Sequence, residues 1–289
     1  MTSKMTENIK NILRPGLYIV ATPIGNLGDI TFRAVETLNS VDLIACEDTR
    51  VSKVLLDKYG IHTPTISVHN YNEADKIDFI KSKLDAGLAI AFISDAGTPL
   101  ISDPGYKVSS SLRDAGYYVT IVPGPSAPIA ALALTGFPTD RFMFIGFVPT
   151  KSNEKTGFFT EVKSERATVV FFESPNRLLD TLSTLSQIFG NRQIAIVREI
   201  TKIYEEVKRG TATELLSYFT QNPPRGEFVG LIHPAVVEKS VDEQKIEKML
   251  SSLLTKLSLK DASEFISSVF DISKKVVYNI GLRMKQKGE

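Results

Sequence analysis

The chain of 289 residues is long enough for two domains with substantial cores, since a domain usually takes about 100 to 200 residues. Its residues are 43% hydrophobic and 23% charged, which is typical of globular rather than disordered proteins. A formal charge of +1 excludes a global basic field, so an RNA partner would have to bind a local patch.

Cysteine and histidine usage narrows the class further. The single cysteine, Cys46, excludes an intramolecular disulfide framework and suits a reducing compartment, so we expect a cytoplasmic protein. Residues 1–14 lack the apolar core of a signal peptide, and no apolar run approaches the roughly 18 residues of a membrane span. His62, His69 and His233 lie far apart in the sequence, so we expect no metal site.

The first half of the chain alternates strand-like and helix-like segments. Short apolar runs predict strands at residues 17–21, 43–46, 65–68, 88–93 and 118–122. Residues with helical spacing lie between these runs, and Gly60, Gly87 and Gly116 are the expected helix ends. The alternation predicts an α/β domain at 15–136 with a mostly parallel sheet covered on both faces.

The second half has fewer helices for the same number of strands. Strands are predicted at 142–148, 167–172, 193–197, 206–210 and 227–233, and helices at 154–162, 176–189 and 213–219. Three helices cannot connect five parallel strands, so the domain at 137–236 should have a mixed sheet with antiparallel neighbours. Residues 237–289 lack strand signals and predict a small helical appendage that resembles a helix-turn-helix.

The segment 93–105, Ile-Ser-Asp-Ala-Gly-Thr-Pro-Leu-Ile-Ser-Asp-Pro-Gly, directly follows the buried strand predicted at 88–93. Gly97 and Gly105 allow left-handed backbone and close approach to a ligand. Asp95 and Asp103, with neighbouring hydroxyls, supply oxygens at the carboxyl end of a strand, where open α/β sheets bind ligands. Two such turns in one short segment predict a binding loop rather than ordinary turns.

Four strand ends in the first domain carry polar or Gly/Pro-rich loops, at residues 22–29, 47–50, 93–105 and 123–127. In a parallel sheet these loops emerge at one edge and form one crevice. Dinucleotide, P-loop and nucleophile-elbow motifs are absent from the sequence. Small residues, backbone groups, hydroxyls and a carboxylate favour a cofactor that contains a nucleoside, and the absence of basic residues from the segment 93–105 argues against a long phosphate tail there.

These motifs resemble the tetrapyrrole-methylase superfamily, and most closely its ribosomal RNA small subunit methyltransferase I family, the cytidine 2′-O-methyltransferases. The similarity covers about residues 17–233. The segment 94–105 is the most specific part of it, supported by residues 20–29, 46–50, 122–127, 172–177, 197–202 and 225–229.

The resemblance implies two α/β domains with S-adenosylmethionine in the cleft between them, and a homodimer. The implied substrate is the 2′-hydroxyl of a cytidine in the decoding region of small-subunit ribosomal RNA, either free or in the assembled subunit. The residues that it places at the cofactor are Pro23, Asp95, Gly97, Thr98, Ser126, Ala127 and Phe172.

A ribose hydroxyl is a weak acid, so a base or a cation near the developing alkoxide would assist methyl transfer. Among the charged residues expected near the cleft, we predict catalytic roles for Glu47, Asp48, Arg50 and Lys202. Alternatives stay open for these residues: Asp48 is equally suited to cap the following helix, and Arg50 and Lys202 to contact phosphate.

Two other functions remain open from the sequence. A methylase of a tetrapyrrole precursor or of a protein side chain would share the fold, and a non-catalytic adapter could bind RNA or a nucleoside. The basic tail residues Lys274, Lys275, Arg283, Lys285 and Lys287 favour RNA, although a small helical cap with a solvated basic surface explains them equally.

Overall fold

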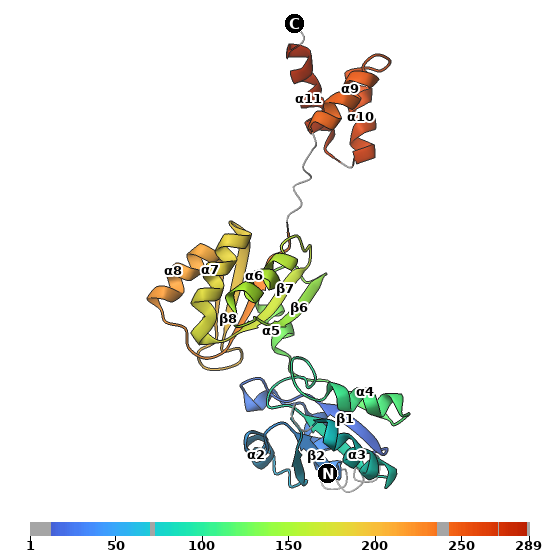
Figure 1. Ribbon diagram of the computed structural model, residues 1–289, viewed down its shortest axis with the longest axis vertical. Helices are drawn as coiled ribbons and strands as arrows, with labels where there is room; N and C mark the ends of the chain where they lie inside the picture. The colour runs from blue at the N-terminus through green and yellow to red at the C-terminus, as the bar shows by residue number, and fades with distance from the viewer. Residues whose placement is uncertain (1–12, 70–72, 236–242, 271, 288–289) are drawn as a thin grey trace, which may run out of the picture. The chain divides into compact units, whose positions relative to one another are not determined.

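The computed structural model describes residues 13–69, 73–235, 243–270 and 272–287, and it divides into two compact units, Met1–Ala235 and Val236–Glu289 (Figure 1). The first unit contains two five-stranded sheets. The predicted division of this unit into domains at residue 136 stays a prediction.

The first sheet is entirely parallel, as predicted, and has the strand order β3-β2-β4-β1-β5. Its strands are β1 (Gly16–Val20), β2 (Leu43–Cys46), β3 (Thr65–Ser67), β4 (Ala89–Ile93) and β5 (Val119–Val122). Every residue of β4 is buried, because this strand is covered by helices on both faces.

Helices cover both faces of the first sheet. The helices are α1 (Phe32–Ser40), α2 (Thr49–Lys58), α3 (Glu73–Asp85) and α4 (Tyr106–Asp114). Leu38 of α1 and Leu56 of α2 share one core with Ile44, whereas Ile80 of α3 and Leu112 of α4 pack on the opposite face. The periodic apolar residues of each helix form the side that packs on the sheet.

The second sheet is mixed, as predicted. Its order is β6-β7-β10-β8-β9, where β6 and β7 are parallel and the other neighbours are antiparallel. The strands are β6 (Phe142–Phe147), β7 (Thr168–Glu173), β8 (Gln193–Arg198), β9 (Glu206–Thr211) and β10 (Phe228–Ile232). One face packs against α6 (Ser152–Glu161), α7 (Leu178–Phe189) and α8 (Ala212–Gln221).

The other face of the second sheet is covered by α5 (Ala127–Thr135), a helix that the sequence did not predict. Ala131 and Leu132 of α5 pack against Val170, Ala195 and Leu231 of the sheet. The segment Ala-Pro-Ile-Ala-Ala-Leu-Ala-Leu-Thr is apolar almost throughout, so it has no polar face to reveal a helical period. The chain thus contributes a helix from the predicted first domain to the core of the second sheet.

The second unit is a three-helix cluster of α9 (Glu243–Leu253), α10 (Leu259–Phe270) and α11 (Lys274–Lys287). Its core contains Ile246, Ile266 and Val277, one residue from each helix. The resemblance to a helix-turn-helix stays a prediction, and residues 237–242 and the side chains of Lys285 and Lys287 lie outside the described residues. No helix in the described ranges is long and apolar enough to cross a membrane.

Candidate functional site

The four predicted loops meet at the carboxyl edge of the first sheet. Thr22 and Gly97 exchange two backbone hydrogen bonds of 2.8 and 3.1 Å, which join the loops after β1 and β4. The Thr98 hydroxyl donates to the Pro125 carbonyl at 3.1 Å, which joins the loops after β4 and β5. The first pair of bonds joins neighbouring strands, and the second spans β1 between β4 and β5, so hydrogen bonds between loops hold the crevice walls together.

The loop after β4 has an unusual backbone. Gly97 and Gly105 have φ values of 80° and 112°, and Leu100 and Ser102 are also left-handed, at 73° and 63°. A Cβ on Gly105 would lie 2.6 Å from the Phe92 ring, so this turn needs glycine for space as well as for conformation. Left-handed backbone at non-glycine residues is uncommon and is often found where a loop is shaped around a ligand.

A cavity of about 380 Å³ lies between the carboxyl end of the first sheet and the second sheet, and we call it the inter-sheet cavity. Its volume is within the usual range for small-molecule sites. Six of the seven residues predicted at the cofactor line it, whereas Pro23 does not. Those six are Asp95, Gly97, Thr98, Ser126, Ala127 and Phe172.

The inter-sheet cavity is acidic. Asp95, Asp103, Glu173 and Glu227 line it, and no Lys, Arg or His does so among the residues that the structure describes. Burial raises the pKa of Asp95, although a hydrogen bond from the Asp48 amide opposes the change. Burial also raises the pKa of Asp103 to about 6, against a lowering hydrogen bond from Ser94. The sequence analysis included Asp103 in the segment 93–105 but did not place it among the cofactor residues, as it did Asp95.

The charge of Glu173 is compensated. Its side chain is fully buried and bonds to Arg177 at 2.9 Å and to the Thr181 hydroxyl at 2.6 Å. Arg177 in turn donates to the Val148 carbonyl at 3.0 Å and to the Ser174 hydroxyl at 2.8 Å. This network fixes the end of β7, where Phe172 faces the cavity.

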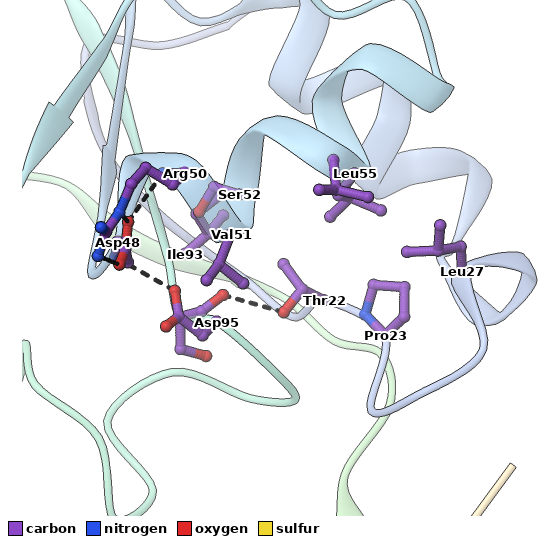
Figure 2. Close-up of a pocket in the computed structure, with 12 residues that line it drawn as sticks. Thr22, Pro23, Leu27, Asp48, Arg50, Val51, Ser52, Leu55, Ile93 and Asp95 are labelled. Carbon is purple, nitrogen blue, oxygen red and sulfur yellow. Dashed lines mark hydrogen bonds and ion pairs between the residues drawn. The ribbon is translucent and has the colours of Figure 1, made fainter. Parts of the chain in front are cut away.

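A second cavity, of about 480 Å³, lies beside α2 at the edge of the first sheet, and we call it the sheet-edge cavity (Figure 2). Asp48 and Arg50 lie at one end of it, and Pro23, Leu27 and Leu55 at the other. Its remaining lining residues are Thr22, Val51, Ser52, Val54, Ile93, Ser94 and Asp95. Among the residues that the structure describes, Asp95 alone lines both cavities.

Two predicted catalytic residues, Asp48 and Arg50, thus line the sheet-edge cavity. Asp48 also caps α2 by accepting a hydrogen bond from the Arg50 amide at 2.8 Å, and its carboxylate binds the Arg50 guanidinium at 2.6 Å. These hydrogen bonds lower the pKa of Asp48 to about 2, so it stays ionised and is a weak base at neutral pH. Arg50 itself is 88% exposed at the mouth of the cavity.

The other two predicted catalytic residues line neither cavity. Glu47 directly follows β2 and is half-buried, and burial raises the pKa of its carboxyl group, with the charges of Asp95 and Asp103 adding to the shift. Lys202 binds Glu199 and Glu227, each at 2.8 Å. Burial lowers the pKa of Lys202, but the hydrogen bonds and charges of Glu199 and Glu227 together raise the pKa by more, so the net shift is upward. Its amine is therefore protonated and already paired.

Within the described residues, no group of three or more His, Cys, Asp and Glu side chains is arranged to hold a metal ion.

Two basic residues of the C-terminal unit are paired with carboxylates: Lys274 contacts Glu264, and Arg283 binds Glu243 at 2.6 Å. Exposed pairs of this kind are weak, so both cations stay available to a stronger anionic partner.

Comparison with known proteins gives one consistent family. Residues 16–216 match the model for tetrapyrrole (corrin/porphyrin) methylases. The chain is 45% identical to ribosomal RNA small subunit methyltransferase I of Rickettsia prowazekii, covering 93% of this chain and 97% of that protein. It is 43% identical to the protein of the same name from Mesorhizobium japonicum, covering 97% and 96% of the two chains.

Solved structures with the same fold are more distant in sequence. A diphthine synthase superposes with a TM-score of 0.60 at 13% identity, covering 75% of this chain and 89% of that one. Cobalt precorrin-4 methyltransferase superposes with a TM-score of 0.55 at 19% identity, covering 75% and 94%. These likenesses support the fold alone, in agreement with the architecture predicted from the sequence.

Proposed function

Because this chain belongs to the ribosomal RNA small subunit methyltransferase I family of tetrapyrrole methylases, we propose that it methylates the 2′-hydroxyl of a cytidine in small-subunit ribosomal RNA. The methyl donor in this proposal is S-adenosylmethionine, and the nucleotide lies in the decoding region. The broader activity, that of a ribosomal RNA methyltransferase, follows from the family. The predicted homodimer and cytoplasmic location stay predictions.

The observation that carries the choice of cofactor is the charge of the inter-sheet cavity. S-adenosylmethionine supplies a methyl group on a sulfonium cation. Four carboxylates without a basic lining residue, in the described part of the chain, suit a cation and would repel a polyphosphate. Glu173 is already paired with Arg177 and Glu227 with Lys202, so Asp95 and Asp103 are the acidic groups best placed to favour a positive ligand.

The other lining residues suit the nucleoside and amino-acid parts of the cofactor. Phe172 and Phe147 line the cavity with ring centroids 5.1 Å apart and provide an apolar wall, and Phe144 packs against Phe172. Ser126 and Ala127 lie at the N-terminus of α5, where backbone amides and the helix dipole favour a carboxylate. Both backbone groups of Gly97 are bound to Thr22, so this glycine would provide close approach to the ligand, and Thr98 would offer the polar contact to a ribose.

The predicted catalytic residues fall into two groups, those that line the sheet-edge cavity and those that line neither cavity. We propose that Asp48 and Arg50 act on the acceptor side, because they line the sheet-edge cavity and not the inter-sheet cavity. Catalytic roles for Glu47 and Lys202, and a cofactor contact for Pro23, remain predictions. Lys202 is better suited to hold the wall formed by Ile200 and Glu227, because its ammonium is bound to two carboxylates.

The test is transfer of radiolabelled methyl from S-adenosylmethionine to small ribosomal subunits that lack the modification, followed by nuclease digestion and mass mapping. Label recovered as 2′-O-methylcytidine would support the proposal. Cofactor binding without transfer to RNA would favour a methylase of a tetrapyrrole precursor or a protein. Absence of cofactor binding would contradict methyl transfer and leave the adapter alternative.

A further inference from the structure

We propose that the sheet-edge cavity holds the acceptor nucleoside of the RNA strand, and that Asp95 accepts the proton of its 2′-hydroxyl. This inference rests on the proposed function. It assigns to the second cavity a ligand distinct from the cofactor, and to Asp95 a role beyond cofactor binding.

The position of Asp95 is the first support. Methyl transfer needs donor and acceptor atoms in line and in contact, so the cofactor site and the acceptor site must adjoin each other. The inter-sheet and sheet-edge cavities share Asp95 and no other residue among those that line them. The two ligands would therefore meet at this carboxylate.

The shape and chemistry of the sheet-edge cavity suit a nucleoside. Its volume of about 480 Å³ is within the range of small-molecule sites. One end is apolar, formed by Pro23, Leu27 and Leu55, and would receive the base (Figure 2). The other end is polar and opens at Arg50, whose side chain is 88% exposed and would contact the phosphates of the same strand.

Exposed apolar side chains on α2 are a further support. Val51 and Val54 of α2 line the cavity and are 47% and 61% exposed. The polar Ser52 on the same helix is buried, so the exposed and buried positions are the reverse of what polarity predicts. Apolar side chains that face a polar-rimmed cavity are typical of a ligand site. Packing of a base against Val51 and Val54 would remove that apolar surface from water.

The proton step follows from the charges. A lone pair of the 2′-oxygen forms the bond to the methyl carbon, and the electrons of the broken carbon–sulfur bond stay on sulfur. The hydroxyl proton moves to the Asp95 carboxylate, so a cation and an anion become two neutral groups. The Asp48 amide donates to Asp95 Oδ1 at 3.2 Å and holds the carboxylate at the junction, while Asp48 itself remains bound to Arg50.

The experiment fills the sheet-edge cavity without touching the other. Val54→Trp places an indole in the cavity, and Val51→Trp does the same from the preceding turn position. Lys53→Trp is the matched control, because Lys53 lies between them on α2, is 69% exposed and lines neither cavity. Each variant is measured for methyl transfer to unmodified small ribosomal subunits and, by calorimetry, for affinity for S-adenosylhomocysteine.

We expect Val54→Trp and Val51→Trp to lower kcat/KM for the RNA by tenfold or more, with S-adenosylhomocysteine affinity within about twofold of wild type, and Lys53→Trp to match wild type in both. Unchanged RNA methylation in both cavity variants would overturn the inference. So would weakened S-adenosylhomocysteine affinity with normal KM for RNA, because the cofactor would then occupy this cavity. If the wild-type protein transfers no methyl group to RNA, the proposed function fails first.

Discussion

The side chain of Lys202 lies directly against Gly25. A Cβ atom added at Gly25 would lie 2.7 Å from both Cγ and Cε of Lys202, closer than two such carbons can approach. Lys202 follows β8 of the second sheet, and Gly25 follows β1 of the first. The ammonium of Lys202 binds Glu199 and Glu227, so one side chain links a loop of the first sheet to a wall of the inter-sheet cavity.

From this contact we predict that Lys202 positions the cavity wall and does not take part in the chemical step. Lys202→Met keeps the apolar stem but leaves Glu199 and Glu227 without their cation. We expect S-adenosylhomocysteine affinity to fall about tenfold, or about 1.4 kcal/mol, and kcat at saturating cofactor to stay within about threefold. Loss of kcat with unchanged affinity, measured by calorimetry and steady-state kinetics, would instead support a catalytic lysine.

Asp95 should be needed for turnover more than for folding. Asp95→Asn keeps an oxygen that accepts from the Asp48 amide but removes the base. We expect kcat to fall by about 10² to 10⁴, the usual contribution of a general base, with the urea midpoint near that of wild type. A variant with normal kcat and only a raised KM for the cofactor would restrict Asp95 to cofactor binding.

Removing the cation that pairs with the buried Glu173 should strongly destabilise the protein. Arg177→Met leaves a fully buried carboxylate without its cation, which typically costs about 3 kcal/mol or more. Glu173→Gln keeps the shape and part of the hydrogen bonding to Thr181. We therefore expect the double variant to be more stable than the sum of the single changes predicts, as measured by denaturant unfolding. Additive effects would show that the pair is not coupled.

Asp103 should make the protein less stable as pH rises through its titration range. Its pKa is raised from 3.8 to about 6 in the folded protein, mainly by burial, so the folded state retains a proton that the unfolded chain has lost. The unfolding free energy should therefore fall between about pH 4 and pH 6. The full pKa shift would correspond to a decrease of about 3 kcal/mol in the unfolding free energy. Because Asp103 is partly exposed, we expect a decrease of about 1 kcal/mol.

Asp103→Asn removes this titration. The difference between the wild-type and variant stabilities, measured by urea unfolding at several pH values, should widen in favour of the variant as pH increases over this range. A difference that is independent of pH would show that Asp103 is as well solvated in the folded protein as in the unfolded chain.

The architecture and much of the crevice could be predicted because they depend on local pattern. Apolar runs such as 89–93 identified the parallel strands, and turn chemistry in the segment 93–105 identified the loop at the carboxyl edge. Parallel topology then required the loops to converge. Helix α5 escaped prediction because its apolar surface is continuous, and its packing on the second sheet is a long-range contact without a local signal.

What the sequence determined by itself was the family, the two sheet types and the set of polar loops, since strand period, glycine positions and motif spacing are properties of the chain. Only the tertiary structure decided how the predicted catalytic residues divide. Asp48 and Arg50 line one cavity, Lys202 is bound to two carboxylates, and Asp95 lies where two cavities meet. Burial, charge pairing and shared walls depend on residues far apart in the chain, and these interactions fix the pKa and the accessibility of each group.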